Sequence, residues 1–322
     1  MAKYRQALPQ LQHSFFMTDG GLETTLIYLD NCELPYFAAF LLFQSEEGEE
    51  ALRRYFKSYA ELARKHEIGL ILETATWRSN PYWGGILGYS LAELEEENRK
   101  AVSLLLDVRQ EYESSHTPVV ISGCIGPRGD GYVAEERMSD EEAEDYHEFQ
   151  IHTFAETAAD MVTALTLTYA DEAIGIVRAA KCMHIPVVIS FTVETDGRLP
   201  SGQLLSAAIQ QVDLETQFYP AYYMINCAHP QHFIAAVSTD DLWVRRIHGV
   251  RANASKLSHS ELNECEELDD GDPVELSEDY SRLLGKQLTN VNIVGGCCGT
   301  DQRHVDHIVS ACLPVFLRRA SS

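Results

Sequence analysis

The hydrophobic pattern along the chain alternates between two kinds of segment. Short, almost continuous apolar runs end in polar residues or glycine, as in residues 69–74 (Gly-Leu-Ile-Leu-Glu-Thr). Between these runs lie longer segments whose apolar residues recur at helical spacing, as in residues 45–66. Runs of this length predict strands buried on both faces, and the amphipathic segments predict helices that cover them. The pattern therefore indicates parallel strands joined by helices.

Eight strands are predicted from the apolar runs: residues 15–19, 69–74, 118–123, 161–167, 186–192, 222–227, 242–247 and 291–294. Helices are predicted over 45–66, 171–184, 203–211, 273–286 and 301–313, and two more open with the capping-box patterns at 90–93 and 139–142. Eight strand–helix pairs in about 300 residues predict an α/β fold, a single (β/α)8 TIM barrel. We expect one domain over residues 1–322, with its chemistry on the loops that follow the strands.

Polar residues follow several predicted strands, at positions that a barrel brings to one mouth. They are Asp19, Thr74, Asn226, Cys227, Asn253, Cys297 and Cys298. Cysteine sulfur is a preferred zinc ligand, and a site with three protein ligands keeps one position open, as in catalytic zinc sites. Three other interpretations compete: buried small hydrophobic residues, a strained disulfide between adjacent cysteines, or a closed structural metal site. Asp19 has its own alternative role as a cap of the following glycine turn.

Composition and charge narrow the class of protein. Hydrophobic residues make up 45% and charged residues 23% of the 322 residues, which is typical of a soluble globular protein. The 25 Lys and Arg against 49 Asp and Glu give a net charge of -24. We therefore expect neither nucleic acid nor an acidic membrane surface as a partner. Ten acids and no Lys or Arg lie between residues 257 and 279, which predicts a mostly exposed loop there.

The cysteines and the apolar runs also bear on location. Eight cysteines without framework spacing predict reduced thiols and a cytoplasmic protein. Nowhere do eighteen uncharged apolar residues follow one another, so we expect no membrane span, and no signal peptide is recognisable.

The motifs resemble those of the zinc-dependent homocysteine S-methyltransferases over nearly the whole chain. The matching motifs are Asp19-Gly20-Gly21-Leu22, Gly126-Pro127, Ser190-Phe191-Thr192, Asn226-Cys227, Asn253 and Gly295-Gly296-Cys297-Cys298. The resemblance implies a (β/α)8 barrel and a zinc ion held by Cys227, Cys297 and Cys298. It also implies transfer of a methyl group from a small sulfonium or ammonium donor to a thiol such as homocysteine, as in methionine biosynthesis.

No catalytic residue is expected beyond the metal site. The resemblance implies that Asp19 contacts the amino group of the acceptor. The full set of candidate substrate-binding residues is Asp19, Gly20, Glu23, Thr74, Trp77, Asn226 and Asn253. Trp77 and Tyr82 are candidates to hold a cationic donor against their ring faces, with simple packing as the alternative.

The sequence departs from the family pattern at Leu165. Family members that use homocysteine carry a glutamate at the end of the fourth strand, and the alignment of Ala159-Asp160 puts Leu165 at that position. A leucine gives an ammonium group no partner, so we expect homocysteine to be a poor acceptor unless Glu23 or another acid substitutes. The methyl donor and the oligomeric state stay open. The alternatives are a non-catalytic or divergent member that binds zinc and a different small thiol or amino-acid metabolite, and a thiol redox protein.

Overall fold

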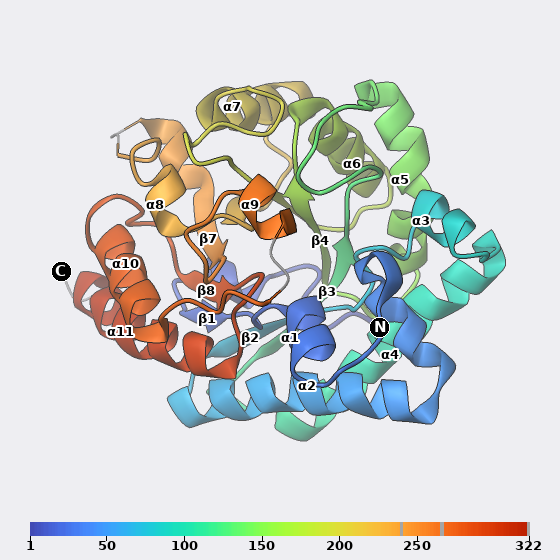
Figure 1. Cartoon of the computed structure of the whole chain (residues 1–322), viewed down its shortest axis with the longest axis horizontal. Coiled ribbons are helices and arrows are strands. Elements are labelled where there is room, and N and C mark those ends of the chain that lie inside the picture. Colours follow the sequence, from blue (N-terminus) through green and yellow to red (C-terminus); the bar gives the residue numbers. More distant parts are fainter. Residues whose placement is uncertain (239–240, 265–266, 321–322) are drawn as a thin grey trace.

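The computed structural model is a closed barrel of eight parallel strands in sequence order, ringed by helices (Figure 1). The structure describes residues 1–238, 241–264 and 267–320. The strands are β1 (Phe16–Met17), β2 (Gly69–Glu73), β3 (Val119–Ile125), β4 (Met161–Leu167), β5 (Val187–Phe191), β6 (Tyr222–Asn226), β7 (Ile247–Ala252) and β8 (Ile293–Gly296). The barrel closes where β1 pairs with β8, Phe16 opposite Ile293. The predicted (β/α)8 barrel is confirmed.

The helices are mostly amphipathic segments that pack their apolar side on the barrel. The α-helices are α1 (Leu22–Tyr28), α2 (Glu46–His66), α3 (Pro81–Ile86), α4 (Leu91–Tyr112), α5 (Asp140–Ala155), α6 (Ala170–Cys182), α7 (Leu205–Thr216), α8 (Pro230–Phe233), α9 (His259–Glu264), α10 (Pro273–Lys286) and α11 (Gln302–Ala320). Four 3-10 helices add η1 (Pro9–Leu11), η2 (Pro35–Phe37), η3 (Ala39–Gln44) and η4 (Leu242–Arg246). Both predicted capping boxes are present, at Ser90 before α4 and at Ser139 before α5. None of the described helices has the length and apolar character that crossing a bilayer requires.

The core has two layers, because alternate residues of each strand point to opposite faces. One layer fills the inside of the barrel with residues such as Ile71, Val120 and Met224, and the other lies between the strands and the helices. Ile71 belongs to the inner layer, so Glu73, two residues on, also points inward at the end of β2. Gly249 lies against the inner residue Met224, and by the same alternation Arg251 points inward at the end of β7. The fold therefore brings charged groups together at one end of the barrel.

The seventh strand was predicted over residues 242–247, and this is wrong. Leu242–Arg246 forms the 3-10 helix η4, and β7 runs over Ile247–Ala252. The apolar run packs against the outside of the barrel through Trp243 and Val244. The true strand contains His248, Gly249 and Arg251, which hide it from a search for apolar runs.

Other predictions need smaller corrections. The helix predicted over 203–211 extends to Thr216, and α1, α3 and α8 lie in segments for which no helix was predicted. The acidic stretch 257–279 is not simply an exposed loop, because it contains α9 and the start of α10. Residues 265–266 of that stretch lie outside the described residues. Figure 1 shows α9 inside the ring of outer helices, above the strand ends.

Candidate metal centre and substrate cavity

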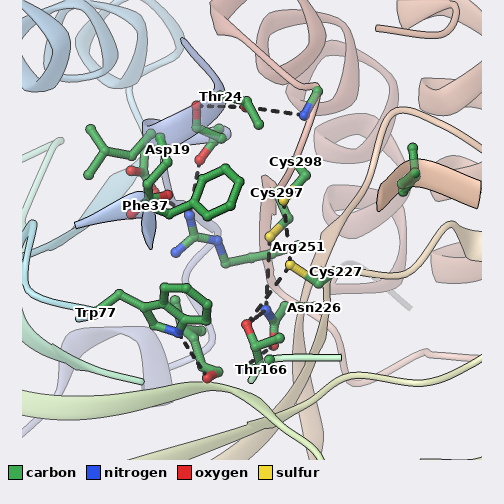
Figure 2. A pocket seen from close by; sticks show the side chains of 18 of the residues that line it. Asp19, Thr24, Phe37, Trp77, Thr166, Asn226, Cys227, Arg251, Cys297 and Cys298 are labelled. Carbon is green, nitrogen blue, oxygen red and sulfur yellow. Dashed lines mark hydrogen bonds and ion pairs between the residues drawn. The ribbon is translucent and has the colours of Figure 1, made fainter. Parts of the chain in front are cut away.

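Three cysteine sulfurs meet at the strand ends (Figure 2). Cys227 follows β6, Cys297 and Cys298 follow β8, and their Sγ atoms all lie within 4.8 Å of one another. The Sγ atoms of Cys227 and Cys298 are 3.8 Å apart. Tetrahedral zinc with bonds of about 2.3 Å to sulfur separates its ligands by about 3.8 Å, so the cluster fits that ion. Hydrogen bonds from the Cys227 and Cys298 thiols lower the pKa of Cys297.

The glycines before these cysteines let β8 pass close to its neighbours. A Cβ atom at Gly295 would lie 1.9 Å from Thr18 Oγ1, and one at Gly296 would lie 1.9 Å from Thr300 Oγ1. A larger residue at either position would force the neighbouring threonine to shift. The glycine pair therefore fixes where Cys297 and Cys298 emerge.

Asn226 ties the sulfur cluster to the ends of β4 and β5. Its Oδ1 accepts hydrogen bonds from the Thr166 amide at 2.9 Å and from the Ser190 hydroxyl at 2.6 Å. Its Nδ2 donates to Thr166 Oγ1 at 2.8 Å and points at Cys297 Sγ, 3.9 Å away (Figure 2). The amide lines the cavity, but its hydrogen-bonding capacity is used within the protein. Its role as a substrate contact stays a prediction.

Tyr132 contacts two of the sulfurs and His259 packs against it, and neither residue was predicted. The Tyr132 hydroxyl lies 3.4 Å from Cys298 Sγ and 3.8 Å from Cys227 Sγ. Its ring stacks on His259 at 4.2 Å between centroids, and His259 Nε2 lies 2.6 Å from the Cys227 carbonyl oxygen. His259 begins α9, so the acidic stretch contributes directly to this site.

Beside the sulfurs, Arg251 bridges two buried carboxylates. Its Nη2 lies 2.6 Å from Asp19 Oδ1, and its Nη1 lies 2.5 Å from Glu73 Oε2. Tyr55 donates a hydrogen bond to the second Asp19 oxygen at 3.1 Å. Burial raises the pKa of Glu73 to about 7, and the Arg251 charge opposes that shift. The predicted candidate Asp19 is therefore present at the mouth, with its charge balanced by an arginine (Figure 2).

A cavity opens above the sulfurs and collects most of the predicted residues. Its lining includes Asp19, Gly20, Glu23, Thr74, Trp77, Asn226 and the three cysteines. Leu165, which is 8% exposed, also lines the cavity, as do the apolar residues Phe37 and Leu268. Asn253 is buried but does not line the cavity, and its Oδ1 has no partner in the described part of the chain.

Of the two predicted aromatic residues, one lines the cavity and the other lies on the surface. Trp77 lines the cavity and donates from Nε1 to the Leu165 carbonyl at 3.3 Å. One face of its ring carries the Arg78 guanidinium, whose Cζ is 3.8 Å from the ring centroid. Tyr82 is 45% exposed and does not line the cavity. A donor cation therefore has at most the other face of Trp77 available.

Comparisons with known proteins bear on this geometry. The family model described as Homocysteine S-methyltransferase matches residues 16–312. Among solved structures, the oxidized form of the homocysteine methyltransferase MmuM from Escherichia coli is 18% identical, with a TM-score of 0.75 over 96% of this chain and 99% of that one. Its metallated form is 17% identical, with a TM-score of 0.74 over 95% of this chain and 99% of that one. Among curated proteins, no sequence matches the chain.

Proposed function

We propose that this chain, which belongs to the homocysteine S-methyltransferase family and is therefore an S-methyltransferase, depends on zinc. The reaction would move a methyl group from a small sulfonium or ammonium donor to a thiol. The observation that carries the proposal is the group of three cysteine sulfurs at the floor of the cavity. Their spacing suits tetrahedral zinc, and the related Escherichia coli enzyme has a metallated form.

Cys227, Cys297 and Cys298 would hold the metal. Bound zinc would supply an open position where an acceptor thiol is held as thiolate at neutral pH, so that no general base is needed. The chain's own residues orient and enclose this position. Asn226 directs an amide hydrogen at Cys297 Sγ, while Tyr132 covers the other two sulfurs and limits the access of water.

Two acids are proposed to contact an ammonium group of the acceptor. Asp19 offers Oδ2, which accepts a hydrogen bond from Tyr55, but Arg251 balances its charge. Glu23 lines the same cavity and has no ion pair among the described residues, so above its raised pKa of about 7 its charge is free to attract a cation. Gly20, Thr74, Trp77, Asn226 and Asn253 stay proposed as further contacts, of which Asn253 must act from outside the cavity lining.

Metal analysis combined with a substrate panel tests the proposal. We expect about one zinc per chain in protein purified under reducing conditions, and methyl transfer to thiols from a panel of sulfonium and ammonium donors. Cys297→Ser should lose both the metal and the activity. The exposed Cys182 provides a matched control, because Cys182→Ser should keep both. Zinc binding and methyl transfer that survive Cys297→Ser would show that the site is assigned to the wrong residues.

A further inference from the structure

Arg78 is a buried guanidinium that lines the cavity and forms no ion pair with the part of the chain that the structure describes. It is 4% exposed, and no carboxylate among the described residues lies close enough to form an ion pair with it. Asp130 and Glu23 also line the cavity, and their more distant charges raise the pKa of Arg78 against the larger effect of burial. Arg251, the other buried arginine of the cavity, is by contrast paired with both Asp19 and Glu73. Only Arg251 is neutralised by carboxylates of the protein, so the charge of Arg78 is the one available to a ligand.

The guanidinium of Arg78 is held rigidly between two indole rings. Its Cζ lies 3.8 Å from the ring centroid of Trp77 and 4.0 Å from that of Trp83. Nη1 donates to the Gly129 carbonyl at 2.9 Å, and Nε is sealed from solvent without a partner. Nη2 makes no hydrogen bond with the described residues, yet it is not sealed in the way that Nε is. Because Nη1 is bonded and Nε is buried, the Nη2 edge is the part of the group left for a ligand in the cavity.

A purely structural role does not account for this arrangement. Taking an unpaired charge out of water costs several kcal/mol, and contacts with ring faces return only about 1–2 kcal/mol each. An apolar side chain of similar length would fill the space between the rings without that cost. Burial lowers the pKa of Arg78 to about 10, so the group is still charged at neutral pH. The charge has a use when an anion enters the cavity.

We propose, on the basis of the function proposed above, that Arg78 binds the carboxylate of a substrate through its Nη2 edge. A planar guanidinium matches a carboxylate, and the two rings keep it in the orientation that such pairing needs. Both the thiol acceptor and the methyl donor are possible sources of the carboxylate. Because Leu165 offers an ammonium no partner, the acid end of the acceptor gains importance over its amino end.

Equilibrium binding tests the proposal without metal or turnover. The probes are 4-(methylthio)butanoate and its primary amide, titrated by calorimetry into chelated protein. We expect the wild type to bind the acid roughly 10- to 100-fold more tightly than the amide, as the loss of a charged hydrogen bond implies. Arg78→Met should bind both equally. Arg78→Lys should keep part of the preference, because lysine keeps the charge but not the fork.

Arg137 provides the matched control. It also donates to backbone carbonyls, of Ala134 and Ser201, and lies 6.0 Å from the ring of Tyr169, but it does not line the cavity. Arg137→Met should keep the wild-type preference for the acid. The proposal is overturned if the wild type binds acid and amide equally, or if Arg78→Met weakens both to the same extent. If Arg78→Met fails to fold, the wild type and Arg78→Lys still decide the outcome.

Steady-state kinetics then identifies the source of the carboxylate. Acceptors with and without a carboxylate, 4-mercaptobutanoate and 1-butanethiol, are crossed with donors with and without one, such as methylmethionine and trimethylsulfonium. A rise in KM for Arg78→Met that is confined to the carboxylated acceptor assigns the contact to the acceptor. A rise confined to the carboxylated donor assigns it to the donor. Absence of methyl transfer with every pair would contradict the proposed function, while the calorimetric result would still decide the role of Arg78.

Discussion

Glu23 is an acid in a position where its charge opposes folding. It lies in the first turn of α1, and burial raises its pKa from 4.5 to about 7. Between these two pH values the folded state binds a proton that the unfolded state has released. The folded state therefore holds more protons, and this group makes the free energy of unfolding fall as pH rises from 4.5 to about 7.

We expect Glu23→Gln to remove this penalty. The amide carries no charge, so the variant should be more stable than the wild type by about 1–2 kcal/mol near pH 8, and nearly equal to it near pH 4. The effect stays modest because the side chain lines an open cavity, where solvent screens its charge. Urea denaturation at both pH values measures the difference. Glu148→Gln, on the exposed side of α5, should show no such pH dependence, and an equal effect of Glu23→Gln at both pH values would contradict the explanation.

Leu165 determines how the cavity receives an amino group. It lines the cavity at the end of β4, where the strand shifts register between Ala164 and Leu167. We expect Leu165→Glu to raise kcat/KM for homocysteine relative to 4-mercaptobutanoate, because the new carboxylate offers the ammonium a partner. Stability should fall by about 1–3 kcal/mol, since an acid is placed at a buried position of a cavity that already holds other carboxylates. If the wild type already uses homocysteine as well as any other thiol, and the variant only loses activity, this account of Leu165 is wrong.

Residues with a local motif were predictable, and residues with distant partners were not. The Gly-Gly-Cys-Cys run and the Asn-Cys pair identify three residues that the structure brings together. Arg251 contacts Glu73 across 178 positions and Asp19 across 232, so no local pattern reveals its role. Arg78 stands out only because it is buried without an ion pair among the residues that the structure describes, and the sequence alone does not show that.

At the scale of elements, β8 positions the metal ligands through its two glycines. We expect Gly296→Ala to destabilise the fold by about 3 kcal/mol or more and to lower zinc content, because the new Cβ meets Thr300 Oγ1. Gly285→Ala, in α10, is the matched control, since a Cβ there has nothing within 4 Å. That change should instead stabilise the protein by about 0.5–1 kcal/mol through helix propensity. Urea denaturation and metal analysis of both variants make the comparison, and equal effects would contradict it.

The strands also show where a search for apolar runs succeeds and where it fails. Strands such as β5 read as apolar runs because both faces are buried by hydrophobic neighbours. β7 is buried as well, but its inner face carries Arg251 and Gly249. Arg251 is neutralised by Asp19, after β1, and Glu73, at the end of β2, while Gly249 leaves room for Met224. When a strand buries a charged residue that distant residues neutralise, its own sequence does not show the apolar run by which strands are recognised. The neighbouring apolar run at Leu242–Arg246 was chosen in its place.

At the scale of the whole molecule, the hydrophobic core stabilises the barrel without help from the metal site, which lies at one end. Hydrophobic layers fill the inside of the barrel and the space under the helices. The three cysteines lie after β6 and β8, where the loops begin. The count of strand–helix pairs was enough to predict this architecture, because a closed barrel of eight parallel strands tolerates the misplacement of one strand by a few residues.

Removal of the metal should therefore leave the fold intact. We expect chelated protein to keep the circular dichroism spectrum of the metal-bound form. Its free energy of unfolding should fall only by the lost metal-binding energy, about a few kcal/mol, and its melting temperature should fall accordingly. Loops after the strands contribute little to a core of this size, whereas structural zinc domains unfold without metal. Added zinc should restore methyl transfer to the chelated protein, because the strands still hold the three sulfurs near one another. Collapse of the helical signal on chelation would instead assign the metal a structural role, since the barrel would then depend on the bonds between β6 and β8.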